Sequence, residues 1–437
     1  MERALAAEGL DELFEQTAER QYVKQLLFSS MVNLMAAVVC GVHPSVRKAH
    51  QAMREQLPVS LAAVYDKLNR TELRTTEALV SYSADRLRPV LEAVVGTVEP
   101  WLAGYRIKVL DGNHLAATER RLEVLRGCAA GPLPGQSLVV LEPETGLAVQ
   151  MVGCEDGHAQ ERSLLDPVLA SVSSRDVYVA DRNFCTLGFL LGVAQREGFF
   201  IIRQHAQLPI ESAGTLRQRG RTESGRLFEQ RITLRQGERT LSARRIVIGL
   251  DTPTRDGVTE IAILTNLPVH DASAAIVADL YHRRWTIESL FARVERNLAS
   301  ELSTLAYPGA ALFAFGVALA ASNVFAVVHA AMMVAQKQQP DPKLANMPLS
   351  DFAIVEAART VYDGLSIALE DDVWDEFQTL PPAWMANQLL GWANNVCWQS
   401  FRKTTRGPKT PTERTRFKNT PHVSTSRLLE GTSTHES

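Results

Sequence analysis

The central part of the chain alternates between short apolar runs and amphipathic stretches. Helices are predicted at 161–171 and 186–197. Runs rich in Val, Ile and Leu, several of them ended by Gly or Pro, predict strands at 105–110, 137–141, 148–152, 176–180 and 199–203. Three strands followed by alternating helices and strands predict an α/β domain with a mixed central sheet.

A further helix, predicted around residues 280–298, has an apolar face and a polar border. At about 100° per residue, its apolar residues fall in one sector roughly 100° wide, which is expected to pack inward; they are Leu280, Ile287, Leu290, Phe291, Val294 and Leu298. Tyr281, Arg284, Glu288 and Glu295 fall in an adjoining sector about 60° wide. A surface ion pair between Arg284 and Glu288 is the plainer interpretation. An active site on this border is the alternative.

Both ends of the chain are predicted to be helical. The first 100 residues contain an amphipathic stretch at 10–25, an apolar one at 25–42 and a helix opened by Pro58-Val-Ser60. Short helices joined by tight turns suit a small DNA-binding domain, and they equally suit a helical cap. A helical region at 350–401 holds four tryptophans, which are expected to be core residues.

The segment from Tyr307 to Ala335 has no charged residue, and its length alone would allow a membrane span. Asn323, His329 and several small residues favour instead a long helix buried in the protein. Acidic residues interrupt the first twenty positions and argue against a secretory signal.

Overall composition sets loose bounds, whereas local charge is more informative. With 437 residues, 46% of them hydrophobic, and a net charge of -3, the chain can form two or three domains and lacks a general positive coat. Five dispersed cysteines fit a reducing cytoplasm.

Residues 204–250 hold nine arginines against four glutamates, with strand-like runs at 227–234 and 244–250. A basic β-rich insertion there suits phosphate contacts; a solvated hairpin pair is the alternative.

The C-terminal segment from Arg402 to Lys418 is also basic. It has seven basic residues and one acid, together with two prolines and a glycine. Such a segment is expected to be disordered alone and to be able to lie along a DNA backbone.

Three carboxylates suggest the chemistry. Asp111 and Asp181 each follow a strand-like run, and they lie 70 residues apart, with Glu288 another 107 residues on. Only folding can bring them together. Clustered carboxylate oxygens suit Mg²⁺, which also accepts phosphate oxygens, and two such ions can promote in-line displacement at phosphorus. Arg284 and Tyr281 would then hold a phosphate nearby.

These residues carry a resemblance to a known family. The ordered set Asp111-Gly, Asp181-Arg-Asn-Phe and Tyr281-x-x-Arg284-x-x-x-Glu288 resembles the DDE transposases of bacterial insertion sequences. Within them it is most similar to the group with a Tyr-Arg-Glu-Lys signature and a β-rich insertion before the Glu. Thr265-Asn-Leu-Pro268 also looks like that group.

The resemblance implies a ribonuclease-H-like catalytic domain in which Asp111, Asp181 and Glu288 bind two Mg²⁺ ions, with Mn²⁺ as a substitute. It implies a helical N-terminal domain (1–100) for the element's ends, a catalytic domain (101–335) with the insertion at about 204–250, and a helical C-terminal region with a basic tail (336–437). It also implies a homodimer that pairs two inverted-repeat ends of double-stranded DNA, then cuts them and joins them to target DNA. A cytoplasmic, nucleoid-associated bacterial protein with no membrane partner is expected.

The expected DNA contacts follow from the same set of motifs and the basic segments. They are Tyr281, Arg284, Arg203, Arg293, Arg296, Arg402, Lys403, Arg406 and Lys409. Arg293 or Arg296 is expected to replace the signature Lys, because Glu295 stands at that position. No Trp lies between Trp101 and Trp285 to stack a flipped base. Phe199, Phe200 and Phe228 are the aromatic alternatives, and the use of a hairpin intermediate is left open.

Two other function classes compete with this one. A catalytically inactive, transposase-derived DNA-binding protein would keep the basic segments and lose the chemistry. A tyrosine recombinase would need His-x-x-Arg before a later Tyr, whereas here Tyr281 precedes His282.

Overall fold

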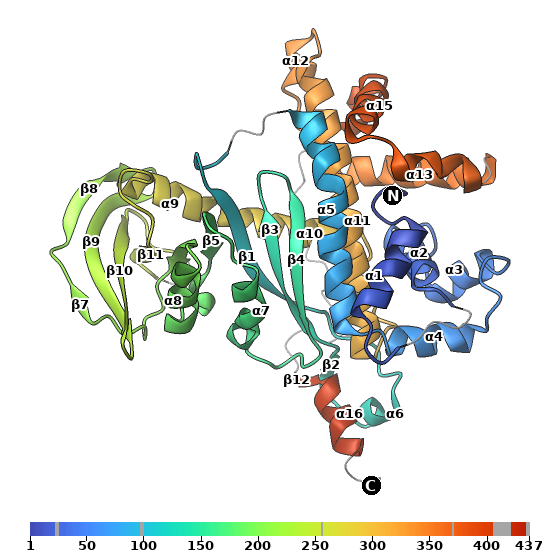
Figure 1. The fold of residues 1–437 in the computed structure, drawn as a ribbon, viewed down its shortest axis with the longest axis horizontal. Coiled ribbons are helices and arrows are strands. Elements are labelled where there is room, and N and C mark those ends of the chain that lie inside the picture. The colour runs from blue at the N-terminus through green and yellow to red at the C-terminus, as the bar shows by residue number, and fades with distance from the viewer. Residues whose placement is uncertain (22–25, 97–99, 255–256, 369–370, 405–420, 434–437) are drawn as a thin grey trace.

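A mixed sheet of ten strands runs through the described part of the chain, which in this computed structural model is residues 1–21, 26–96, 100–254, 257–368, 371–404 and 421–433 (Figure 1). The strand order is β4-β3-β1-β5-β6-β11-β10-β9-β7, with β8 paired to β9. β1, β5 and β6 are parallel to one another, and the other pairs are antiparallel. The strands are β1 (Arg106–His114), β3 (Gln136–Glu142), β4 (Leu147–Cys154), β5 (Asp176–Ala180), β6 (Phe199–Arg203), β7 (Ser212–Ala213), β8 (Arg217–Thr222), β9 (Gly225–Gln236), β10 (Arg239–Leu250) and β11 (Glu260–Thr265).

Both faces of the central strands are buried. In β5, Val177 and Val179 belong to one apolar core, whereas Tyr178 and Ala180 belong to the other. Helices α7 (Leu165–Ala170) and α8 (Leu187–Gln195) cover the second core, and α5 (Leu73–Val95) and α11 (Pro308–Lys337) contribute to the first. Burial on two faces explains why the strands are nearly continuous in Val, Ile and Leu. The predicted mixed α/β architecture with a large mixed sheet is confirmed.

The strand that carries Asp111 is longer than predicted. β1 continues to His114, because Gly112, Asn113 and His114 pair with Leu138, Ser137 and Gln136 of β3. Asp111 therefore lies within the strand rather than after it.

The basic insertion continues the main sheet instead of standing apart from it. β10 pairs with β11 along six residue pairs, and β9 pairs with β10. Leu227 and Ile246 face the core that α9 (Ala274–His282) joins, whereas Ile232 and Leu234 face the core of α8. The insertion is thus held from both sides.

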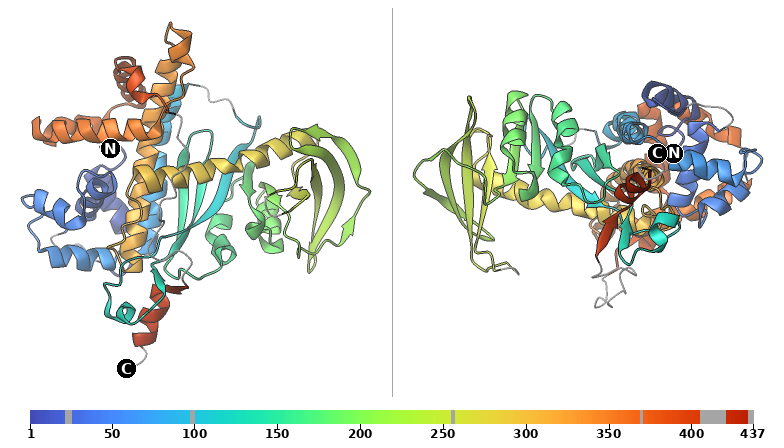
Figure 2. Two further views of the ribbon diagram at one scale, coloured as in Figure 1. Left: turned by 180° about the vertical axis from the view of Figure 1, so that it is seen from behind. Right: turned by 90° about the horizontal axis from the view of Figure 1, so that it is seen from below.

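The N-terminal helices pack against α11 or against one another. They are α1 (Ala7–Thr17), α2 (Phe28–Val39), α3 (Val46–Ala52), α4 (Leu61–Asn69) and α5. α5 and α11 lie side by side (Figures 1 and 2). Two glycines allow this close approach, because a Cβ on Gly309 would lie 2.9 Å from the Thr71 carbonyl oxygen and one on Gly316 would lie 2.4 Å from a Thr76 methyl carbon.

α11 is the apolar segment that was predicted to be a buried helix. Among the described residues it is the one helix long and apolar enough to cross a membrane, yet 83% of its apolar window is buried inside the protein. The fully buried Asn323 donates to Ser83 Oγ and the Ala148 carbonyl, both at 2.9 Å, and accepts from Ala148 N at 2.8 Å. Its amide is therefore satisfied within the core, as a buried polar group must be.

The helix predicted around 280–298 is interrupted. α9 ends at His282, Arg283–Trp285 form the 3₁₀ turn η3, and α10 (Thr286–Asn297) follows. The apolar sector packs inward as predicted, because Leu280, Ile287, Leu290, Val294 and Leu298 are buried.

Part of the C-terminal region lies beside the segment that connects β1 to β3. β12 (His422–Ser424) pairs in parallel with β2 (Gly131–Leu133), a pairing that the sequence did not predict. The remaining elements are α6 (Glu123–Arg126), η1 (Glu161–Leu164), η2 (Arg182–Phe184), α12 (Pro342–Ala345), α13 (Asp351–Ala368), η4 (Asp371–Trp374), α14 (Glu376–Thr379), α15 (Pro382–Asn394), η5 (Trp398–Phe401) and α16 (Thr425–Ser433). Trp398 is buried, but Trp384 and Trp392 are 43% and 52% exposed, so the prediction that they are core residues is wrong.

Candidate active site

Asp111 and Asp181 lie at matching positions of two neighbouring parallel strands. Leu110 of β1 is in register with Ala180 of β5, and each aspartate is the next residue along. Asp181 caps η2, where it accepts a hydrogen bond from Asn183 N at 2.7 Å. The sheet itself thus brings together two carboxylates that are 70 residues apart in the sequence.

Arg284 connects Asp111 to Glu288. Its Nη1 donates to Asp111 Oδ2 at 2.9 Å, and its Nη2 donates to Glu288 Oε1 at 3.3 Å. The Arg284 side chain is 11% exposed, that of Asp111 is 19% exposed and that of Glu288 is 43% exposed. The pair predicted as a surface contact therefore reaches inward to the sheet, and this is possible because α10 packs on β1.

Negative charge accumulates around Asp111. Burial is the main reason that the pKa of Asp111 is raised to about 6, and repulsion from Asp181 and Glu161 adds to it. Arg284 and the Gly112 N–H, which donates to Asp111 Oδ1 at 3.0 Å, act in the opposite direction. Burial therefore outweighs the stabilisation of the charged carboxylate by Arg284 and the Gly112 N–H.

Tyr281 borders the same cluster. Its phenol is half-buried, and burial raises its pKa, while the positive charges of Arg284 and Arg203 oppose this rise. Arg203, at the end of β6, therefore lies near Tyr281. The structure brings together Asp111, Asp181, Glu288 and these three predicted phosphate contacts.

Glu161 is a carboxylate of this cluster that the sequence did not reveal. Its Oε2 accepts a hydrogen bond from Asn183 Nδ2 at 3.3 Å, and its charge acts on Asp111. In the sequence it only opened a predicted helix. The contact depends on folding, and no spacing or periodicity could have indicated it.

The donor set suits a divalent cation, although its present arrangement includes Arg284. In the described part of the chain no three His, Cys, Asp or Glu side chains lie close enough to hold a metal ion as they stand. The carboxylate oxygens are the hard ligands that Mg²⁺ prefers, and the buried Asp111 lies among like charges. Asp111, Asp181 and Glu288 are the residues that would hold such an ion.

Two predicted phosphate contacts on α10 lie elsewhere. Arg293 is largely buried, its charge faces Asp351 and His329, and burial lowers its pKa. Arg296 and Glu295 are exposed, and the charge of Glu295 acts on Glu301 rather than on Asp111. Arg293 or Arg296 in place of the signature Lys therefore stays a prediction, and of the two Arg296 is the exposed side chain.

The predicted tail contacts are only partly described. Arg402 and Lys403 are exposed, and Arg402 forms a backbone bridge with Leu349. Arg406 and Lys409 lie outside the described residues.

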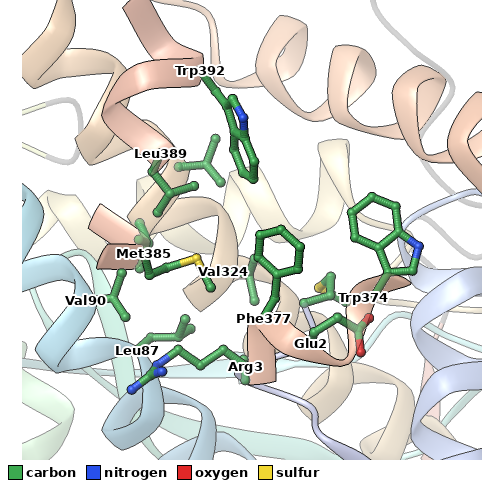
Figure 3. Close-up of a pocket in the computed structure, with 14 residues that line it drawn as sticks. Glu2, Arg3, Leu87, Val90, Val324, Trp374, Phe377, Met385, Leu389 and Trp392 are labelled. Atoms are coloured by element: carbon green, nitrogen blue, oxygen red, sulfur yellow. The ribbon is translucent and has the colours of Figure 1, made fainter. Parts of the chain in front are cut away.

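A separate cavity of about 170 Å³ lies beside α5 and α11 (Figure 3). Leu87, Val324, Phe377 and Trp392 are among its mostly apolar lining residues. None of the carboxylates described above lines it, so it is not part of the candidate active site.

Comparison with known families agrees with this geometry. Residues 136–323 match the family model of the transposase DDE domain. The match supports a transposase of the DDE type. It runs from β3 into α11 and includes Asp181, Arg284 and Glu288, whereas Asp111 precedes it. No curated protein matches the chain.

Proposed function

We propose that the protein is a DNA transposase that cuts the ends of an element and joins them to target DNA, with Asp111, Asp181 and Glu288 as its catalytic carboxylates. The observation that carries this proposal is the register of β1 and β5, which sets two aspartates side by side, combined with the link from Asp111 through Arg284 to Glu288. The match to the transposase DDE domain supports the same reaction class.

The strand order supports a ribonuclease-H-like catalytic domain. Three antiparallel strands, β4, β3 and β1, are followed across the sheet by the parallel β5 and β6. A basic insertion then precedes the helix of Glu288, in the order expected of the group with the Tyr-Arg-Glu-Lys signature from bacterial insertion sequences.

Two Mg²⁺ ions, or Mn²⁺ as a substitute, would activate the attacking water or 3′ hydroxyl and stabilise the leaving oxygen. Asp111, Asp181 and Glu288 would hold them. Arg284, Tyr281 and Arg203 surround these carboxylates and would orient the phosphate that reacts. Arg284 would exchange its carboxylate partners for phosphate oxygens, because a guanidinium binds either with paired N–H donors.

The remaining assignments follow from the proposed reaction. The helices before residue 100 would bind the inverted-repeat ends, and the exposed arginines of the insertion would contact DNA phosphates. A homodimer would hold two ends at once. A protein that acts on chromosomal DNA in this way would work in the cytoplasm at the nucleoid.

Cleavage of a labelled duplex that carries the inverted repeats flanking the gene tests the proposal. The wild-type protein should nick the repeat ends only with Mg²⁺ or Mn²⁺. Asp111→Ala, Asp181→Ala and Glu288→Ala should each lower cleavage by at least about 10³-fold and retain duplex binding, because they remove metal ligands rather than phosphate donors. The measurement is gel analysis of cleavage beside a binding titration.

Asp166→Ala is the matched control, because Asp166 is an exposed acid on α7, outside the carboxylate cluster. It should cut as the wild type does. Retained cleavage in any carboxylate variant would remove that residue from the catalytic set. Binding by the wild type without metal-dependent cutting would favour an inactive DNA-binding derivative.

A further inference from the structure

Glu161 lies where the strand of Asp111 meets the turn of Asp181. It opens η1, and its side chain is 17% exposed. Its Oε2 accepts a hydrogen bond from Asn183 Nδ2 at 3.3 Å, and its Oε1 lies 3.8 Å from His114 Nδ1. One carboxylate therefore contacts both β1 and η2.

The glycine after Asp111 makes room for this carboxylate. A Cβ on Gly112 would lie 2.1 Å from Glu161 Oε1 and 2.5 Å from Glu161 Cδ. Real Cβ atoms essentially never approach so closely, so any side chain at position 112 would displace Glu161. This packing gives a physical reason for glycine in the Asp111-Gly112 motif.

The asparagine after Asp181 serves the same contact from the other side. The backbone N–H of Asn183 donates to Asp181 Oδ1 at 2.7 Å, while its side-chain amide donates to Glu161. Asn183 thus ties Glu161 to the aspartate two residues before it. Glu161 therefore contacts both motifs: it packs against Gly112 and accepts a hydrogen bond from Asn183.

We propose that Glu161 is a positioning residue of the active site, which fixes the turn after Asp181 against the strand of Asp111 and adds its negative charge to the cation site. The inference rests on the proposed function, because it concerns the same carboxylates. Its geometry is independent of that function: two segments 70 residues apart meet at one side chain. The charge of Glu161 also reaches Asp111, where it opposes ionisation.

Binding of Mn²⁺ to the full-length protein, measured by calorimetry without DNA, tests the charge. Glu161→Gln keeps the size of the side chain and an oxygen that can accept from Asn183, but it removes the negative charge. Residues behind the ligands of a metal site typically change its affinity by about 10- to 100-fold, and we expect a loss in this range at an unchanged melting temperature. Asp166→Asn is the control that removes an exposed charge of the same segment, and it should bind Mn²⁺ as the wild type does.

A second pair of variants tests the contact itself. Gly112→Ala should weaken Mn²⁺ binding and lower the melting temperature by a small amount, since the new methyl group displaces the flexible end of the Glu161 side chain. Adding Glu161→Ala to Gly112→Ala removes the collision. It should restore the melting temperature but not the Mn²⁺ affinity.

The results distinguish failure of the role of Glu161 from failure of the proposed cation site. Mn²⁺ affinity that depends on Asp181 but is unchanged in Glu161→Gln would overturn the role of Glu161 alone. A melting temperature that Glu161→Ala fails to restore would overturn the contact with Gly112. A wild-type protein that binds no Mn²⁺ would overturn the cation site of the proposed function, and the role of Glu161 in it.

Discussion

Two buried arginines in this molecule have opposite surroundings. Arg244 in the insertion donates to Glu229 Oε1 at 2.6 Å and to the Leu267 and Ala272 carbonyls at 3.0 and 2.8 Å, and both side chains of the ion pair are 7% exposed. The second oxygen of Glu229 pairs with Arg219 at 2.9 Å. Here one carboxylate has two guanidinium partners.

Arg284 is in the reverse situation. It contacts Asp111 and Glu288, and it lies within reach of the charge of Asp181. One guanidinium faces several carboxylates. The comparison teaches that the two ion pairs differ in the number of carboxylates for each guanidinium, which the presence of an ion pair alone does not reveal.

The largest expected effect on stability comes from breaking the buried ion pair between Arg244 and Glu229. Arg244→Met leaves Glu229 buried with only the half-exposed Arg219 as a partner, and it should lower the free energy of unfolding by about 3–5 kcal/mol. Arg219→Met removes the 47% exposed partner of the same carboxylate and should cost no more than about 1 kcal/mol. Urea unfolding of both variants measures the difference. Equal losses would mean that the buried contact has no special weight.

At Asp111, removing a charge should raise the free energy of unfolding instead of lowering it. The pKa of Asp111 is raised from 3.8 to about 6, so the folded protein binds this proton more tightly than the unfolded chain does. Folding stability is unaffected by Asp111 below about pH 4, decreases as the pH rises towards about 6, and is then lower by roughly 3 kcal/mol. Without metal at pH 8, Asp111→Asn should therefore be more stable than the wild type by up to about 3 kcal/mol.

The pH dependence distinguishes this effect from a simple change in packing. The advantage of Asp111→Asn should vanish near pH 4, and Asp166→Asn, at an exposed position, should differ from the wild type by less than about 0.5 kcal/mol at either pH. The charges that face Asp111 are those of Arg284, Asp181 and Glu161. A stability gain that persists unchanged at pH 4 would show that the ionisation of Asp111 is not its cause.

The smallest effect on stability is expected at the surface of the insertion, where charge meets solvent. Arg217 and Arg226 are exposed on β8 and β9. Reversing both to Glu should change stability by less than about 0.5 kcal/mol. The slope of log affinity for the duplex against log salt concentration should become shallower by about two, or about one for each lost phosphate contact. Lys337→Glu with Lys343→Glu, two exposed charges at the end of α11 and on α12, is the matched control. Equal salt slopes in the two double variants would exclude the insertion from the DNA contact.

The strands were predictable from the sequence for a physical reason. β5 and β6 are buried on both faces, so nearly every residue is apolar, and the runs at 176–180 and 199–203 match the strands residue for residue. The signal of β1 faded at Asp111, because Asp, Gly and Asn disfavour strands. Its last residues are extended only because β3 pairs with them.

The candidate site was partly predictable. Asp111, Asp181 and Glu288 followed from an ordered set of motifs, and the register of β1 with β5 is consistent with a common site. The break at Arg283–Trp285 was missed, since the apolar period continues across it. Glu161 was missed because its contacts with Gly112 and Asn183 join distant segments.

The helices on either side of η3 together form a rod from Ala274 to Asn297, roughly 36 Å long at 1.5 Å per residue. Figure 2 shows this rod crossing the sheet, with α9 on the insertion strands and α10 running to α11. One end of this rod contacts the arginine-rich strands, and the other end contacts β1. The insertion is thus joined to the helix of Glu288 by two routes, through the pairing of β10 with β11 in the sheet and along this rod. The 3₁₀ turn between the two helices, where helical hydrogen bonding is poorest, carries Arg284.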